Sequence, residues 1–126
     1  AFPPRHPDVP ERYRNIGQPV IIPGDMGRAS WRLVGQPAAM RLSCGTTCHG
    51  AGRLLSRTAA SQRARGRRIA RELAEVGVVA RARSWQGLAE EQPEAYKDVS
   101  HVVEVVHRAG LARKVARLRP MCVIKG

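Results

Sequence analysis

A histidine beside two glycines is the feature of this sequence best suited to chemistry. The stretch reads Cys48-His49-Gly50-Ala51-Gly52-Arg53. Glycine has no Cβ, so the backbone at such positions can approach a ligand closely. The backbone N–H groups of a glycine-rich loop that opens into a helix can bind an anion such as phosphate. Arg53 and Arg57 are four residues apart, which predicts that both lie on one face at the start of that helix and contact phosphate. The pattern predicts a histidine held against a phosphate-binding turn.

Two other interpretations of these residues stay open. A histidine in a glycine-rich loop is often only a solvated loop residue. Zinc is the second alternative, although a closed structural zinc site needs four ligands and usually has tighter paired spacing. The candidate ligands are Cys44, Cys48, His49 and, only through long-range folding, Cys122.

The residues before this loop predict an arm and a hairpin. Residues 1–15 are proline-rich and charged, which indicates an extended arm without regular structure. Residues 18–22 are a short, β-branched segment, and residues 30–34 are a second strand candidate closed by Gly35. The turn between them, residues 23–27, contains two glycines. We therefore expect a β-hairpin whose tip can meet a ligand.

The residues after the loop mix helical and strand patterns. Residues 54–76 predict a mostly helical segment, weakened at Gly66 and ended by Gly77. Residues 78–83 alternate apolar and basic side chains, as a half-buried strand does, and short helical turns are expected within residues 85–97.

The last third of the chain completes an α+β fold with mixed strands and helices. Asp98 or Ser100 can cap a helix that runs to about Arg108, although its valines also suit a strand. Residues 111–118 fit either a helix or a strand, and residues 121–124 predict a last strand.

Length and charge limit the function classes. A chain of 126 residues forms one domain with a modest core, and a formal charge of +12 with a pI near 11.3 favours an anionic partner such as RNA. Solvated arginines without a partner are the alternative explanation of the charge. No stretch approaches 18 apolar residues, and no signal peptide is visible. Three cysteines, an odd number, indicate a reducing cytoplasm rather than a disulfide framework.

Five segments in the same order resemble the C-terminal part of the RtcB family of RNA-splicing ligases. They are Ala1-Phe2-Pro3-Pro4, Gly17-Gln18-Pro19-Val20-Ile21-Ile22-Pro23-Gly24, His49-Gly50-Ala51-Gly52-Arg53, Glu94-Ala95-Tyr96-Lys97-Asp98 and Lys125-Gly126. One short motif is weak evidence, whereas five in order are specific. Because the first residues already resemble an internal stretch of the family, we interpret residues 1–126 as the guanylate-binding C-terminal portion of an RtcB-like fold, without the N-terminal metal-binding portion.

This resemblance implies a GTP-dependent RNA ligase that joins a 3′-phosphate (or 2′,3′-cyclic phosphate) end to a 5′-hydroxyl end, as in tRNA splicing and RNA repair. In the family, the motif histidine attacks the α-phosphorus of GTP, and this role falls on His49. The implied nucleotide-binding residues are Pro23, Gly24, Asp25, Met26, Ser30, Gly50, Ala51, Gly52, Tyr96 and Lys125.

The family also uses two manganese ions, whose ligands lie upstream of residue 1. None of His6, His101 and His107 falls at a matching position, so no metal ligand is assigned here. We therefore expect these 126 residues alone to be inactive. The expected partners are GTP, RNA with the two end types, and an activating protein. A truncated, non-catalytic basic domain that binds RNA is the alternative function.

The sequence departs from the family at the turn after Pro23. The family usually has Gly-Ser-Met-Gly-Thr, where this chain has Gly24-Asp25-Met26-Gly27-Arg28. A carboxylate beside nucleotide phosphates repels them unless a cation neutralises it. We hypothesise that Asp25 and Arg28 form an ion pair across the turn.

Overall fold

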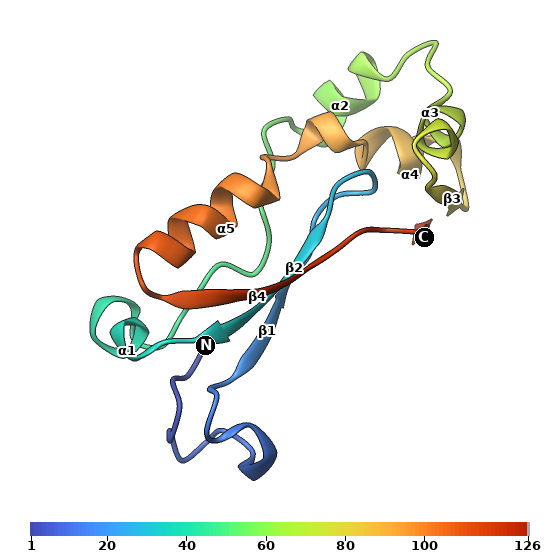
Figure 1. Cartoon of the computed structure of the whole chain (residues 1–126). Helices are drawn as coiled ribbons and strands as arrows, with labels where there is room; N and C mark the ends of the chain where they lie inside the picture. Colours follow the sequence, from blue (N-terminus) through green and yellow to red (C-terminus); the bar gives the residue numbers. More distant parts are fainter. Residues whose placement is uncertain (126) are drawn as a thin grey trace.

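A three-stranded antiparallel sheet forms the centre of the fold (Figure 1). The computed structural model describes residues 1–125; Gly126, part of the terminal Lys125-Gly126 match, lies outside the described residues. The strands are β1 (Pro19–Ile22), β2 (Ser30–Gly35) and β4 (Ala112–Leu118), in the order β1-β2-β4. Strand β1 pairs Ile22 with Trp31 of β2, so the predicted hairpin is confirmed.

One face of this sheet is covered by helix α5 (Val99–Arg108). Alternate strand residues point to this face, because successive side chains of a strand lie on opposite sides. The core between sheet and helix is made of Ile22, Leu33, Val99, Val103, Val106 and Ala112. Asp98 is the N-cap of α5 and accepts a hydrogen bond from the Ser100 backbone N–H, as the sequence predicts.

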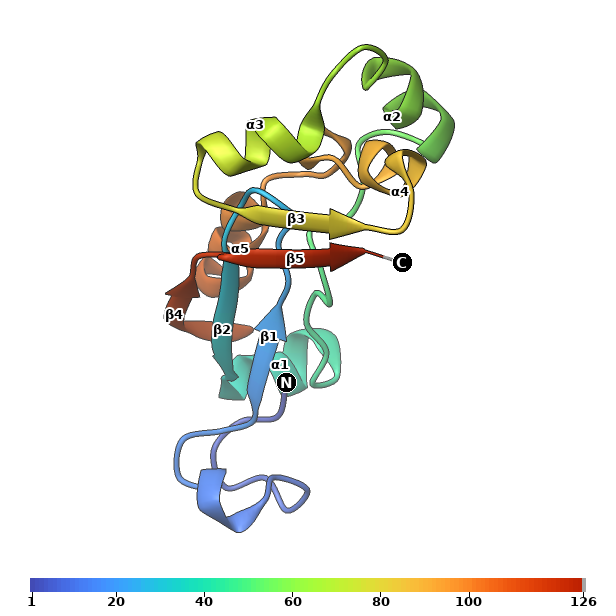
Figure 2. The same ribbon diagram turned by 90° about the vertical axis from the view of Figure 1, so that its right-hand side faces the viewer.

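A second cluster of elements surrounds the tip of the hairpin (Figure 2). It contains helices α2 (Arg57–Arg63), α3 (Ile69–Glu75) and α4 (Trp85–Glu90), the 3-10 turn η2 (Pro93–Ala95), and a parallel strand pair, β3 (Val79–Ala82) with β5 (Cys122–Lys125). Its core consists of Met26, Ala64, Ile69, Leu73, Val78 and Ala89. Met26 comes from the hairpin turn and is 1 % exposed, so its side chain anchors the turn in this second core.

The N-terminal arm packs against the far end of the sheet. As predicted, it is irregular apart from one 3-10 turn, η1 (Glu11–Tyr13). The Gln18 backbone N–H donates to the Phe2 carbonyl at 2.9 Å. A side chain at Gly35 would clash with that same carbonyl oxygen, so glycine at this position lets the arm lie against β2.

The fold class is confirmed as α+β, but three local expectations need correction or completion. Residues 54–76 form two helices, with the break near Gly66 that the sequence allowed; the φ of Gly66, +75°, is the left-handed backbone that favours glycine. Residues 111–118 fitted a helix or a strand, and the structure shows strand β4 over Ala112–Leu118. Helix α1 (Pro37–Ser43) was not predicted, although Pro37 stands at its first turn, where proline is favoured. Within residues 1–125, no helix has the length and apolar character needed to cross a membrane.

Candidate functional site

His49 lies in the loop between α1 and α2 and is exposed. A Cβ added at Gly50 or Gly52 would meet no atom within 4 Å, and Gly52 has φ +78°. The far end of the loop is fixed to the segment around Tyr96, because Arg53 and Tyr96 form an antiparallel bridge and Lys97 N–H donates to the Gly52 carbonyl at 3.0 Å. The loop therefore presents its histidine and an open glycine backbone from a fixed base.

The predicted placement of Arg53 and Arg57 at the start of one helix is wrong. Helix α2 begins at Arg57, after Ser56 accepts a hydrogen bond from the Ala59 N–H as the N-cap. Arg53 precedes the helix, and its guanidinium donates to the carbonyls of Leu55 (3.0 Å) and Glu90 (2.6 Å). Arg53 is thus committed to contacts within the protein, whereas Arg57, with a 72 % exposed side chain, keeps most of its surface open.

The Glu91 carboxylate contacts the side chains of Arg53, Tyr96 and Lys125. The sequence assigned Tyr96 and Lys125 to nucleotide binding. The carboxylate of Glu91 is 3.1 Å from Arg53 Nη1 and 3.5 Å from Lys125 Nζ, and it accepts a hydrogen bond from the Tyr96 hydroxyl. The Arg53 guanidinium also donates to the Tyr96 hydroxyl at 2.9 Å and lies 4.8 Å from the centre of its ring. Sequence reasoning missed Glu91, because no motif includes it and only the fold brings it to these partners.

These contacts shift two titrating groups in opposite directions. Burial acts to raise the pKa of Glu91, but the Tyr96 hydrogen bond and the charges of Lys125 and Arg53 outweigh it and hold that pKa below its ordinary value. The pKa of Tyr96 is raised, first by burial and then by the hydrogen bond to Glu91 and its negative charge. At neutral pH the pair is therefore a carboxylate that accepts from a protonated phenol.

We expect the Glu91→Gln variant to form tyrosinate at lower pH than the parent protein. The substitution removes the carboxylate that raises the pKa of Tyr96, while Arg53, which lowers it, remains. The measurement is an ultraviolet absorbance titration of tyrosinate formation, from which the same titration of a Tyr96→Phe variant is subtracted so that Tyr96 alone is followed. Glu90→Gln is the matched control, since Glu90 is the neighbouring carboxylate and contacts Arg57 instead. Equal titrations of Glu91→Gln and the parent would contradict this cluster.

The hairpin turn confirms the hypothesised pair. Arg28 Nη1 lies 3.3 Å from Asp25 Oδ2, at ion-pair distance but without hydrogen-bond geometry. The other carboxylate oxygen, Oδ1, accepts from the backbone N–H groups of Gly27 and Arg28, each at 2.9 Å. The Asp25 side chain is only 1 % exposed, so the expectation that it faces the nucleotide phosphates is wrong: it stabilises its own turn. Burial raises the pKa of Asp25, against the two backbone hydrogen bonds and the Arg28 charge.

The other turn residues have structural roles beside any role in binding. Ser30 Oγ accepts from the Gly24 N–H at 3.1 Å and closes the neck of the turn, where a side chain at Gly24 would clash with the Ala29 carbonyl. Met26 is buried as a whole residue, so it holds the turn in the second core and offers little surface to a ligand. Pro23 is exposed. Arg28 Nη1 also donates to the Tyr96 carbonyl at 3.3 Å and thereby connects the turn to the Tyr96 segment.

The described residues offer no metal centre. Within residues 1–125, no three His, Cys, Asp or Glu side chains come together in a way that could hold a metal ion. The candidate zinc ligands therefore do not converge in the part of the chain that the structure describes. The same finding means that the residues present do not fit a manganese site.

Comparison with known proteins identifies the family. A family model described as tRNA-splicing ligase RtcB matches residues 1–126. Over 126 residues, 100 % of this chain, the sequence is 57 % identical to the tRNA-splicing ligase RtcB of Thermococcus kodakarensis and 51 % identical to that of Pyrobaculum aerophilum, covering 26 % of each relative. The Pyrococcus horikoshii protein of the same name is 56 % identical over the same span, which is 14 % of its length.

The chain thus spans about a quarter or less of the length of these curated relatives. The matches run through the histidine loop, the hairpin turn and the Tyr96 segment without leaving any part of the chain uncovered. The chain belongs to the RtcB family of tRNA-splicing ligases.

Proposed function

We propose that the protein carrying this chain is a GTP-dependent RNA ligase that joins an RNA 3′-phosphate or 2′,3′-cyclic phosphate to a 5′-hydroxyl. One observation carries this proposal for the chain itself. His49 is the exposed histidine of an open glycine loop, in a chain that the family model matches from end to end. The three free cysteines agree with the reducing cytoplasm that we expect as its location.

The proposed role of His49 is nucleophilic. An imidazole nitrogen forms a bond to the α-phosphorus of GTP, and the bond to the bridging oxygen of pyrophosphate breaks, so that pyrophosphate leaves with the electron pair. A 2′,3′-cyclic phosphate would first be opened by water to a 3′-phosphate. An oxygen of the RNA 3′-phosphate then attacks the guanylate phosphorus, and the bond to the imidazole nitrogen breaks and frees His49. Attack by the 5′-hydroxyl on the phosphorus of the RNA 3′-phosphate displaces GMP, and the hydroxyl proton is lost to solvent. Exposure of His49 allows the substrate to reach it.

The other assigned residues would bind and orient the nucleotide. The open backbone at Gly50, Ala51 and Gly52 suits close approach of the ribose and α-phosphate. The Ser30 hydroxyl accepts from Gly24 but can still donate, and Lys125 has donors beyond its contact with Glu91. Because Arg53 covers one face of the Tyr96 ring, only the other face can stack on a base. The manganese ions that the family uses would be held by residues outside this chain, and we derive no step through them.

The experiment that tests this proposal offers the protein two sets of RNA ends. With GTP and manganese, we expect joining of a 3′-phosphate strand to a 5′-hydroxyl strand, and no joining of 3′-hydroxyl to 5′-phosphate ends. Denaturing gel electrophoresis of the labelled product measures this. The 126 residues alone should join neither pair. RNA binding without ligation by the whole protein would favour the alternative, a non-catalytic basic RNA-binding domain.

A further inference from the structure

A basic cavity of about 550 Å³ lies between the hairpin turn, the N-terminus of α5 and the segment that follows β4. A cavity of this size is within the range that small ligands and their groups occupy. Its lining residues are Gly27, Arg28, Ala29, Asp98, Ser100, Arg117, Arg119 and Pro120. None of the site residues that the sequence assigned lines it.

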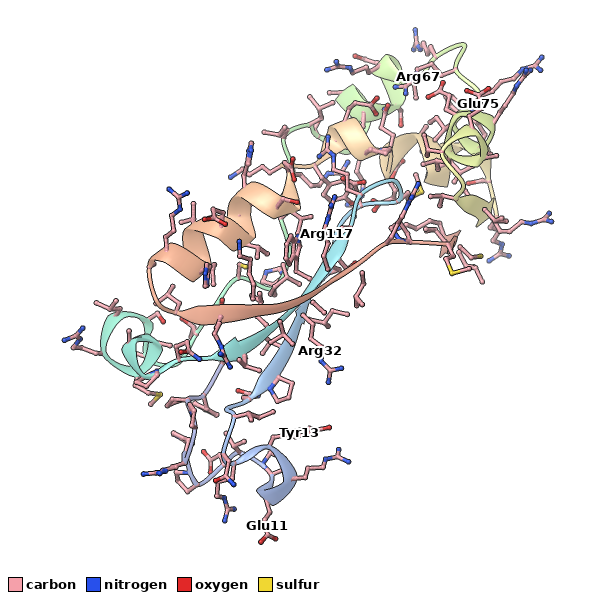
Figure 3. The ribbon with its side chains drawn as sticks, in the orientation of Figure 1. Glu11, Tyr13, Arg32, Arg67, Glu75 and Arg117 are labelled. Carbon is pink, nitrogen blue, oxygen red and sulfur yellow. The ribbon has the colours of Figure 1, made fainter. Side chains whose placement is uncertain are left out.

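The strand register explains why Arg117 faces this cavity. Arg117 lies opposite Trp31 in the β2–β4 pair, so both side chains are on the face that α5 covers. Trp31 Nε1 donates to Ser100 Oγ at 3.4 Å, which fixes this end of the sheet to α5. Arg32, one residue on, points to the opposite face. Figure 3 shows Arg117 on the side of α5 and Arg32 on the other side.

The cations of the cavity exceed its one carboxylate. Arg28 is already paired with Asp25, so Arg117 and Arg119 against Asp98 leave a formal balance of one positive charge. Among the described residues, Arg117 and Arg119 form no ion pair, and Arg119 Nη2 donates only to the Val76 carbonyl, at 3.1 Å. By contrast, Lys114 and Arg108 on the neighbouring surface share Glu104. Uncompensated guanidinium groups that converge on a cavity suit a phosphate, which accepts bidentate hydrogen bonds from arginine.

We propose that this cavity binds phosphate groups through Arg117 and Arg119. The favoured ligand is the backbone of an RNA strand beside the hairpin turn, and this choice of ligand rests on the proposed function. A free diphosphate such as inorganic pyrophosphate has the same chemistry. The site is distinct from Arg53, whose donors are used within the protein.

The test measures binding of a labelled single-stranded oligouridylate, long enough to span a site of about 16 nucleotides, to the protein that carries this chain. Replacing both Arg117 and Arg119 with glutamine should weaken binding roughly tenfold at physiological salt and reduce the slope of log K against log salt by about 1.4. The matched control replaces Arg41 and Arg65 with glutamine. Both are exposed, lie outside the cavity, and have no side-chain hydrogen bond or ion pair to another described residue.

A second variant tests the same cavity through a change that should strengthen RNA binding. Asp98→Asn keeps a good N-cap for α5 while it removes the one carboxylate of the cavity. We expect this variant to bind the oligouridylate more tightly than the parent protein. Weaker or unchanged binding would mean that phosphate does not enter beside Asp98.

Direct calorimetry with inorganic pyrophosphate distinguishes the two sources of phosphate. Loss of RNA affinity in the Arg117/Arg119 variant beyond that of the control indicates a strand backbone, and loss of pyrophosphate binding alone indicates a free diphosphate. If the control pair has the same effect on both ligands, or neither pair has any, the site is disproved. These binding assays need neither guanylylation nor ligation, so failure of the proposed function is observed separately.

Discussion

With α-labelled GTP and manganese, the protein that carries this chain should acquire an acid-labile guanylate label, and His49→Ala should abolish it. A bond between an imidazole nitrogen and phosphorus is labile to acid, which separates it from a phosphate ester on a hydroxyl. We expect no detectable guanylate label on the variant, because the alanine side chain has no nucleophilic atom to form the bond. The label is measured after denaturation and separation of free nucleotide.

The structure predicts that this substitution spares the fold. His49 is exposed and lies in a loop, so its side chain is not part of either core. Surface substitutions of this kind usually change the free energy of unfolding by about 0.5 kcal/mol or less. His101→Ala and His107→Ala are matched controls, since both histidines are exposed and lie on α5. A label that persists in His49→Ala, or is lost in the α5 variants, would refute the assignment of the nucleophile.

Most elements could be predicted from the sequence because local signals define them. The hairpin follows from a β-branched segment and a second short strand candidate around a glycine turn, and α5 follows from the Asp98 cap and the Gly110 stop. Residues 111–118 were ambiguous because Leu111, Val115 and Leu118 suit a helical stripe, and pairing with β2 decided the outcome. The parallel pairing of β3 with β5 joins segments about forty residues apart, which no local pattern specifies.

The site was harder to predict than the fold, because its charges find partners across the sequence. Arg53 was expected to contact phosphate, but the Tyr96 bridge turns it toward Glu91 and the Glu90 carbonyl. Arg117 and Arg119 carried no motif, and only the β2–β4 register and the Pro120 segment bring them together with Arg28. Sequence spacing identified the residues of the histidine loop. It did not identify which arginines remain free for a ligand.

Arg28→Thr should harm guanylylation more than any other single change in the hairpin turn. The substitution leaves the Asp25 carboxylate, 1 % exposed, with only two backbone N–H donors. Removing one partner of a buried ion pair lowers the free energy of unfolding by about 3–5 kcal/mol. The Arg28 side chain is 36 % exposed, so solvent screens its charge. We therefore expect a smaller loss of folding stability, about 2–3 kcal/mol. Loss of the Arg28 contact to the Tyr96 carbonyl would also release the turn from the Tyr96 segment.

The double-mutant cycle of Asp25→Ser, Arg28→Thr and both together separates these two effects. Coupling through charge predicts that the double variant regains most of the guanylylation rate, because no stranded carboxylate remains. Serine can still accept from the Gly27 N–H and hold the turn. If the contact to Tyr96 is what matters, the double variant stays as slow as Arg28→Thr. Simple addition of the two single effects would show that the pair is not coupled.

The pH dependence of folding stability is an independent test of the ion pair between Asp25 and Arg28. Burial already raises the pKa of Asp25, and the Arg28 charge opposes this shift. Removing Arg28 therefore raises that pKa further, so the carboxyl binds a proton at a higher pH than in the parent protein. Ionisation of Asp25 costs folding free energy above its ordinary pKa, and protonation removes this cost as the pH falls. The free energy of unfolding of Arg28→Thr, measured by urea denaturation, should thus approach that of the parent protein toward acid pH, whereas a gap independent of pH would rule out a stranded charge at Asp25.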